Sequence, residues 1–277
     1  MTRKTELAGQ IAVITGAGSG IGSATARLLA ARGAKVHLAD LNAEAAEAVA
    51  RQIRQAGGSA EAHAVDVADP AAVEALAKAV YDADGRVDIL HNNAGIAHAG
   101  NIEATTIEDW QRVIGVNLLG VAYGIQAFVP RMLTQGRPAS IVNTASLAGL
   151  VPSALMAPYC ASKYGVVGMT EALNAELSGQ GIHVSAVCPG VINTAIARTG
   201  IMRGRMETIQ GQVTATYARR GTPPEAVAEA VLRAIRTRKM IITVPRKEAL
   251  PGVLLHRISP RLAQPIARYF VKYASRG

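Results

Sequence analysis

The sequence predicts an α/β fold in which one parallel, doubly wound sheet is covered by helices on both faces. Short aliphatic runs alternate along the chain with longer stretches of helical period, and few Pro or Gly clusters interrupt them. Apolar residues make up 49% of the chain but include only two Phe and one Trp, so the core is expected to be aliphatic. An aliphatic core suits helices packed on a parallel sheet, whose ligands bind at the carboxyl ends of the strands.

Seven segments are predicted to be the strands of this sheet. In chain order they are 11–14, 35–39, 60–65, 87–91, 139–143, 183–187 and 240–244. Helices are expected to fill most of the intervals, which gives right-handed crossover connections. The sequence has no internal repeat and no linker, so residues 1–277 are expected to form a single domain of about seven strands.

A glycine-rich turn follows the first predicted strand. Residues 15–22 read T-G-A-G-S-G-I-G, and a helical run comes directly after them. Between a strand and a helix, glycines let the backbone approach a pyrophosphate, and the helix N-terminus supplies N–H groups and positive potential. A tight turn without a ligand would need only one or two of these glycines. We therefore predict that a dinucleotide binds at Gly16, Ser19, Gly20, Ile21 and Gly22.

Asp40 ends the second predicted strand. An acidic group at this place can accept hydrogen bonds from the adenosine ribose. It would repel the 2′-phosphate of NADP, and neither Ser19 nor Leu41 supplies a compensating positive charge. The sequence therefore predicts NAD rather than NADP.

Tyr159 and Lys163 are four residues apart in Y-C-A-S-K, and Ser146 lies thirteen residues before the tyrosine. Positions i and i+4 share one face of a helix, so the ammonium group would lie beside the phenol. A nearby cation lowers the pKa of a phenol, which is about 10 when unperturbed, and makes tyrosine usable as an acid–base group. The alternative is that Tyr159 and Lys163 are only a pair on the surface of a helix, but the glycine turn and Asp40 favour a catalytic role.

Taken together, these motifs resemble the short-chain dehydrogenase/reductase family over about residues 9–195. Further matches are the D-V pair at Asp66, the N-N-A-G segment at 92–95, Asn117 in G-V-N-L-L-G, Pro189-Gly190 and Thr194. The resemblance implies a Rossmann-type fold and an NAD(H)-dependent oxidoreductase. Such an enzyme transfers a hydride between a CH–OH or C=O group and nicotinamide.

The resemblance also implies a role for each matching residue. Tyr159 would be the general acid–base, Ser146 would hydrogen-bond the substrate oxygen, and Lys163 would bind the nicotinamide ribose. Asn117 would help to hold a proton-relaying water, or would only complete a local hydrogen-bond network. Residues 92–95 are expected to pack against the glycine turn, and Asp66 to cap its own loop in part. The residues expected to contact the cofactor are Gly16, Ser19, Gly20, Ile21, Gly22, Asp40, Leu41, Asp66, Val67, Asn93, Ala94, Gly95, Tyr159, Lys163, Pro189, Gly190, Ile192 and Thr194.

Residues 190–222 correspond to the substrate lid of this family. Apolar side chains here and after Ser146 predict a pocket for a bulky, largely hydrocarbon alcohol or ketone. They are Ile192, Ile196, Ile201, Met202, Met206, Ile209, Leu150, Val151, Leu155 and Met156. Arg198, Arg203 and Arg205 leave open an anionic substrate, either a carboxylate or an acyl thioester.

The chain continues after the seventh predicted strand as a basic extension, residues 245–277. Residues 198–277 hold 16 Lys and Arg against four Asp and Glu, so the excess of positive charge lies in this part. A helix is predicted from Ser259, with an apolar face formed by Leu262, Ile266, Tyr269, Phe270 and Tyr273 and a basic stripe formed by Arg261, Arg268 and Lys272. Its apolar face would pack on the domain or on a partner subunit, or the helix would lie on an anionic membrane.

Other classes of protein fit the sequence less well. The six histidines (37, 63, 91, 98, 183 and 256) show no metal-ligand spacing, so no metal site is predicted. Charge alone does not indicate nucleic-acid binding. No signal peptide and no stretch near the roughly 20 apolar residues of a membrane span is evident, so a cytoplasmic protein is expected. The family resemblance implies a homo-oligomer, a dimer or a tetramer. A non-catalytic dinucleotide-binding regulator or scaffold is the alternative from another class.

Overall fold

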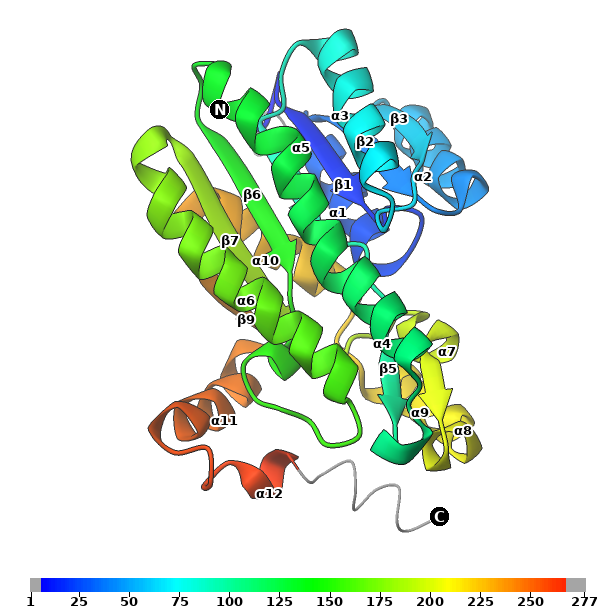
Figure 1. Ribbon diagram of the computed structural model, residues 1–277. Helices are drawn as coiled ribbons and strands as arrows, with labels where there is room; N and C mark the ends of the chain where they lie inside the picture. Colours follow the sequence, from blue (N-terminus) through cyan, green and yellow to red (C-terminus); the bar gives the residue numbers. More distant parts are fainter. Residues whose placement is uncertain (1–5, 268–277) are drawn as a thin grey trace.

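A seven-stranded parallel sheet forms the middle layer of the protein (Figure 1). The computed structural model describes residues 6–267, apart from the side chains of residues 247–249, 266 and 267. The order across the sheet is β3-β2-β1-β4-β6-β7-β9. The strands are β1 (Ile11–Thr15), β2 (Lys35–Asp40), β3 (Ser59–Ala64), β4 (Ile89–Asn92), β6 (Ala139–Thr144), β7 (Ile182–Pro189) and β9 (Ile241–Val244). The predicted fold class is confirmed, and each of the seven predicted segments forms one of these strands.

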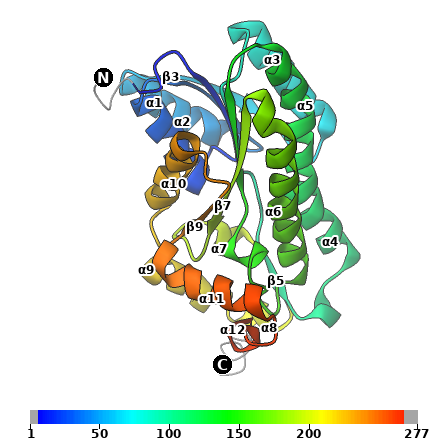
Figure 2. The same cartoon turned by 90° about the vertical axis from the view of Figure 1, so that its left-hand side faces the viewer.

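Helices cover both faces of the sheet (Figure 2). One layer consists of α1 (Gly20–Ala31), α2 (Ala43–Gln55) and α10 (Pro224–Thr237), and the other of α3 (Pro70–Asp84), α5 (Gly120–Thr134) and α6 (Ala157–Leu177). The side chains of Asn42 and Asp69 cap α2 and α3 by accepting a hydrogen bond from a first-turn N–H group. Aliphatic side chains such as Leu29, Leu38, Leu90 and Ile141 are fully buried between the layers, as the composition predicts.

The chain reverses its direction of winding at β1. It proceeds from β1 outward through β2 to β3, and then returns to place β4 on the other side of β1. The loops after β1 and β4 therefore leave the sheet toward opposite layers and open a crevice at its carboxyl edge. Every motif that the sequence singles out as chemical lies at or near this edge.

A second, two-stranded sheet lies below the carboxyl edge and was not predicted. It pairs β5 (His98–Gly100) with β8 (Ile201–Arg203), next to α7 (Ile196–Thr199), α8 (Arg205–Thr208) and α9 (Gln210–Arg220). Its strands are three residues long and form through contacts between distant parts of the chain. A period-two pattern is not detectable over so short a run.

The longest helix of the protein combines α4 (Ile107–Ile114), a π-helical turn (Gly115–Leu119) and α5. The expectation that no stretch approaches a membrane span is wrong for this helix, since residues 107–134 are long and apolar enough by composition. The helix packs against α3, α6 and β4, and core helices meet the same test. Its apolar character is explained by that packing.

The helix predicted from Ser259 does not form there. Instead α11 (Arg246–Ile258) follows β9, Ser259 ends it in an extended conformation, and α12 (Gln264–Ala267) begins later. Pro265 is the second residue of α12, a first-turn position that suits proline, whereas in a helix begun at Ser259 it would lie further inside and remove a backbone hydrogen bond. Leu262 is exposed. Arg261 is exposed as well, while the side chain of Ile266 and all predicted members from Arg268 onward lie outside what the structure describes.

Candidate active site

A pocket of about 960 Å³ opens at the carboxyl ends of the sheet strands. Most of the residues predicted for the site line it together. They are Gly16, Ser19, Gly20, Ile21, Asp40, Leu41, Asp66, Val67, Asn93, Ala94, Gly95, Ser146, Tyr159, Lys163, Pro189, Gly190, Ile192 and Thr194. Gly22 and Asn117 lie behind this lining, against Gly16 and Gly95 respectively.

The glycine turn after β1 folds closely over itself. Gly16 has a φ of +63°, a conformation that side chains disfavour. A Cβ atom on Gly22 would lie 2.1 Å from the carbonyl oxygen of Gly16, so only glycine fits at that position. Because α1 begins at Gly20, its first N–H groups lie at the pocket wall. The turn thus has the bare backbone and helix N-terminus that a pyrophosphate needs.

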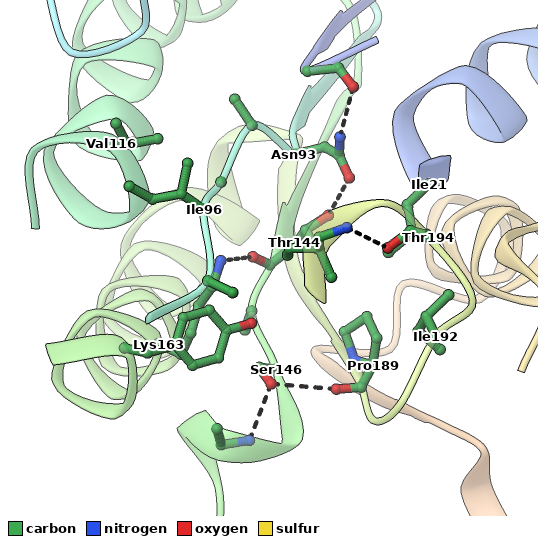
Figure 3. A pocket seen from close by; sticks show the side chains of 18 of the residues that line it. Ile21, Asn93, Ile96, Val116, Thr144, Ser146, Lys163, Pro189, Ile192 and Thr194 are labelled. Atoms are coloured by element: carbon green, nitrogen blue, oxygen red, sulfur yellow. Dashed lines mark hydrogen bonds between the residues drawn. The ribbon is translucent and has the colours of Figure 1, made fainter. Parts of the chain in front are cut away.

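Asn93 fixes the glycine turn from the neighbouring strand, as Figure 3 shows. Its Nδ2 donates to the carbonyl oxygens of Thr15 at 2.9 Å and Gly16 at 3.3 Å. The hydroxyl of Thr144 donates to Asn93 Oδ1 at 3.2 Å. The expectation that residues 92–95 pack against the glycine turn is therefore confirmed.

Two carboxylates mark the part of the pocket where β2 and β3 end. Asp40 accepts hydrogen bonds from the N–H groups of Gly18 at 2.8 Å and Asn42 at 2.9 Å. It therefore braces the glycine turn as well as facing the pocket. Asp66 accepts from the N–H of Ala68 at 2.9 Å, which confirms that it caps its own loop.

Ser146, Tyr159 and Lys163 meet on the opposite side of the pocket. Ser146 follows β6, where its hydroxyl donates to the carbonyl oxygen of Pro189 at 3.3 Å and accepts from the N–H of Ala148 at 3.1 Å (Figure 3). Tyr159 and Lys163 lie one turn apart on α6, and the ammonium nitrogen is 5.8 Å from the centre of the phenol ring. Lys163 Nζ also donates to the carbonyl oxygen of Thr144 at 2.9 Å (Figure 3). The predicted shared helix face is confirmed.

Burial in the protein shifts the pKa values of Tyr159 and Lys163 in the direction that favours their neutral forms. Burial raises the pKa of Tyr159, while the hydrogen bond with Ser146 acts in the opposite direction. Burial lowers the pKa of Lys163 to about 8. The predicted lowering of the Tyr159 pKa is not found for the chain alone, where burial of the phenol dominates, and the lowering with nicotinamide bound stays a prediction.

Asn117 lies buried in the π-helical turn between α4 and α5. Its Oδ1 accepts from the N–H of Ile96 at 2.8 Å, and its Nδ2 donates to the carbonyl oxygen of Ile96 at 2.9 Å and to Ser162 Oγ at 3.2 Å. The side chain thus completes a local network, which was one of its two expected roles. A Cβ on Gly95 would lie 3.2 Å from Asn117 Oδ1 and 3.5 Å from Lys163 Nζ, so both groups flank Gly95. The water relay stays a prediction.

The apolar side of the pocket differs from the predicted set. Four of the predicted residues line it: Ile192, Ile196, Val151 and Met156. Three other predicted side chains form a buried cluster beneath the small sheet, namely Met202, Met206 and Ile209. Leu150 belongs to the main core. The structure adds lining residues that sequence reasoning missed: Leu147, Pro152, Tyr217, Pro251, Gly252 and Val253.

Similarity to known proteins agrees with this architecture. The family model described as short chain dehydrogenase matches residues 10–201. The chain is 40% identical over 236 residues to D-threitol dehydrogenase of Mycolicibacterium smegmatis, covering 85% of this chain and 89% of that protein. It is 37% identical over 262 residues to "Probable oxidoreductase EphD" of Mycobacterium tuberculosis. That match covers 92% of this chain, which spans 44% of the length of EphD.

Solved structures are similar over nearly the whole chain. A short-chain dehydrogenase/reductase from Burkholderia phymatum in complex with NAD has a TM-score of 0.86 and 35% identity, covering 93% of this chain and 96% of that chain. A metagenomic short-chain oxidoreductase in complex with NADP has a TM-score of 0.71 and 34% identity, covering 86% and 96%. With the matching family model, the relatives and the order of motifs around one pocket, the chain belongs to the short-chain dehydrogenase family.

Proposed function

We propose that the protein is an NAD(H)-dependent oxidoreductase that interconverts an apolar secondary alcohol and the corresponding ketone. One observation carries the proposal: the hydroxyls of Ser146 and Tyr159 and the ammonium of Lys163 share one pocket with the glycine turn. The names of relatives such as D-threitol dehydrogenase and cyclohexanol dehydrogenase support an alcohol as the substrate class.

Each residue of this cluster has a task that follows from its surroundings. The glycine turn and Thr194 would hold the nicotinamide dinucleotide, which would supply the hydride acceptor or donor. Tyr159 accepts the proton of the substrate hydroxyl during oxidation and returns it during reduction. Ser146 holds the substrate oxygen by a hydrogen bond, and the buried site strengthens this contact. The charge of Lys163 favours the phenolate once the positively charged nicotinamide also lies nearby.

The alternative of a non-catalytic regulator has less support. A scaffold that only binds a dinucleotide would need the glycine turn and the residues next to it. It would have no use for a hydrogen-bonded Ser146 and Tyr159 facing the same space as a buried Lys163. Burying a lysine is costly, and burial already lowers its pKa to about 8, so a chemical role explains it better.

The apolar substrate class is favoured over an anionic one by the position of the lid arginines. The described residues that line the pocket do not include Arg198, Arg203 or Arg205. Arg203 instead forms a paired contact with the carboxylate of Asp109, at 2.8 Å and 2.7 Å. It thus ties β8 to α4 and serves the structure of the lid.

We expect the enzyme to prefer NAD over NADP by at least about tenfold in kcat/KM, because Asp40 would lie against the 2′-phosphate. The Asp40→Asn variant should narrow this difference. Its amide oxygen can still accept the hydrogen bond of Gly18, so the glycine turn is kept while the negative charge is removed. Steady-state kinetics with both cofactors measure the ratio. A wild-type enzyme that prefers NADP would overturn the assignment.

The C-terminal segment is proposed to form one wall of the substrate site. Pro251, Gly252 and Val253 of α11 line the pocket, and Val253 is also part of the main core. The hydroxyl of Tyr164 and Nε2 of His256 lie 3.2 Å apart, which ties α11 to α6. Together with the proposed lid of residues 190–222, α11 would close the apolar side of the pocket against water.

Val253→Ala is expected to lower kcat/KM for a bulky apolar alcohol by about tenfold, because it removes two methyl groups from the pocket wall. The affinity for NADH should stay unchanged. Leu254→Ala is the matched control, since Leu254 is the next residue of α11 and its side chain is half exposed. Kinetics with a series of cyclic and linear alcohols and titration of NADH fluorescence separate the two effects. Equal losses of kcat/KM in Val253→Ala and Leu254→Ala would argue against α11 as a wall of the substrate site.

A further inference from the structure

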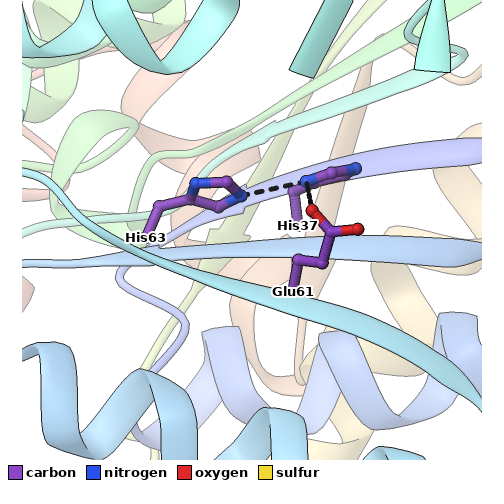
Figure 4. Close-up of side chains that lie close together, drawn as sticks. All are labelled: His37, Glu61 and His63. Atoms are coloured by element: carbon purple, nitrogen blue, oxygen red, sulfur yellow. Dashed lines mark hydrogen bonds and ion pairs between the residues drawn. The ribbon is translucent and has the colours of Figure 1, made fainter. Parts of the chain in front are cut away.

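A group of metal-ligating side chains lies at the outer edge of the main sheet, on β2 and β3. In the parallel register of these strands His37 is opposite Glu61, and His63 follows two residues later on β3. Side chains two residues apart on a strand point to the same face, so the backbone itself brings the three together (Figure 4). The two histidines are separated by 26 residues in the chain, which is why the spacing in the sequence did not indicate a metal site.

The distances within this group suit a small metal ion. His37 Nδ1 lies 3.0 Å from His63 Nε2 and 3.7 Å from a carboxylate oxygen of Glu61, and the three ligand atoms are within 4.8 Å of one another. Ligands bound tetrahedrally to zinc at about 2.0–2.1 Å are separated from each other by about 3.3 Å. Shifts of a fraction of an ångström would therefore place all three around one ion.

The partner of the second ring nitrogen supports this geometry. Nε2 of His37 lies 2.8 Å from a carboxylate oxygen of Asp84, at the end of α3. When that nitrogen donates its proton to Asp84, Nδ1 keeps its lone pair and directs it toward His63 and Glu61. A carboxylate that orients a metal-binding histidine in this way is a recurring feature of metal sites.

The charges around the group are also suitable. Lys35 Nζ lies 2.7 Å from Oε1 of Glu61 and 3.0 Å from Oδ1 of Asp84. The other oxygen of Glu61, Oε2, is the one that faces His37. With one lysine and two carboxylates, the surroundings carry a net negative charge.

We propose that His37, Glu61 and His63 bind a divalent transition-metal ion of the zinc class, with water as the fourth ligand. Access from solvent is open because the side chain of Glu61 is 47% exposed. The bound ion would tie the edge strand β3 to β2, which carries Asp40 at its end. In the part of the chain that the structure describes, the lining of the large pocket includes none of the three ligands, so this site is separate from the proposed catalytic one.

A hydrogen bond from His63 to His37 explains the 3.0 Å distance without a metal, and binding measurements distinguish the two arrangements. The full-length protein is stripped with a chelator and titrated with Zn²⁺ by calorimetry. We expect one ion per chain with a Kd of about 1 µM or tighter, and a rise in Tm of about 5 °C at saturating zinc. Co²⁺ should give the visible absorption bands of a four-coordinate site.

Variants at the more exposed positions test the ligands without disturbing the core. Glu61→Gln and His63→Gln should each weaken zinc binding by more than about 100-fold, and Asp84→Asn by about 10- to 100-fold. His183→Gln is the control, because His183 lies in β7 on the far side of the sheet and should leave zinc affinity unchanged. Absence of one-to-one binding, or wild-type affinity in both ligand variants, would refute the site.

Discussion

Replacement of Tyr159 by Phe is expected to reduce turnover by about 100- to 10,000-fold, the usual contribution of a positioned acid–base group. The change removes one hydroxyl and keeps the ring, which packs with Ala148 and Cys160 on the buried side of the pocket. The dinucleotide is held mainly by the glycine turn and its neighbours, so its affinity should stay within a few-fold of the wild type. Formation of NADH measures turnover, and NADH fluorescence measures binding.

Tyr164→Phe provides a matched control for this experiment. Tyr164 is on the same helix, and its hydroxyl contacts His256 rather than the pocket. The same chemical change there should leave kcat nearly unchanged, and any loosening of α11 should appear instead as a higher KM for the substrate. If Tyr159→Phe kept the turnover of the wild type, the proton would have to move through another group, and the proposed mechanism would be wrong. A loss of equal size in both variants would indicate a disturbance of α6 instead.

The sheet and the centre of the site could be predicted because their signals are local. Most strands of the main sheet are short aliphatic runs, and the chemical residues follow directly after such runs or lie four residues apart on one helix. The pKa of Tyr159 could not be predicted correctly from that spacing. Its value depends on burial by α6, the loop after β6 and the lid, which are far apart in the sequence.

The parts that were missed depend on contacts between distant segments. The three-residue strands β5 and β8 pair only because the chain folds back from Gly100 to Ile201. The wall formed by α11 could not be foreseen from an apolar pattern, because its pocket residues include a proline and a glycine, Pro251 and Gly252. The same holds for His37 and His63, which become neighbours through the register of two parallel strands. The periodicity of a sequence predicts its helices and strands. Contacts between residues that are far apart in the chain depend instead on how those helices and strands are arranged.

Gly22→Ala is expected to weaken dinucleotide binding by about 100-fold and to reduce catalysis in proportion. The added Cβ would lie 2.1 Å from the carbonyl oxygen of Gly16 and 2.7 Å from Nδ2 of Asn93. Neither neighbour can yield easily, because the first is backbone and the second holds the turn through its bonds to Thr15 and Gly16. Relieving such an overlap costs about 1–3 kcal/mol, the upper end of which corresponds to a factor of about 100.

A second glycine-to-alanine change separates this steric effect from a general loss of stability. Gly168 lies on the exposed side of α6, and a Cβ there would meet nothing within 4 Å. Gly168→Ala should therefore keep full NADH affinity and raise stability by about 0.5–1 kcal/mol, the helix preference of alanine over glycine. Titration of NADH fluorescence and thermal melts of both variants provide the comparison. Wild-type affinity in Gly22→Ala would mean that the turn relaxes around a methyl group, or that the pyrophosphate lies elsewhere. A loss confined to Gly22→Ala would locate the pyrophosphate at the bare backbone between Gly16 and the start of α1.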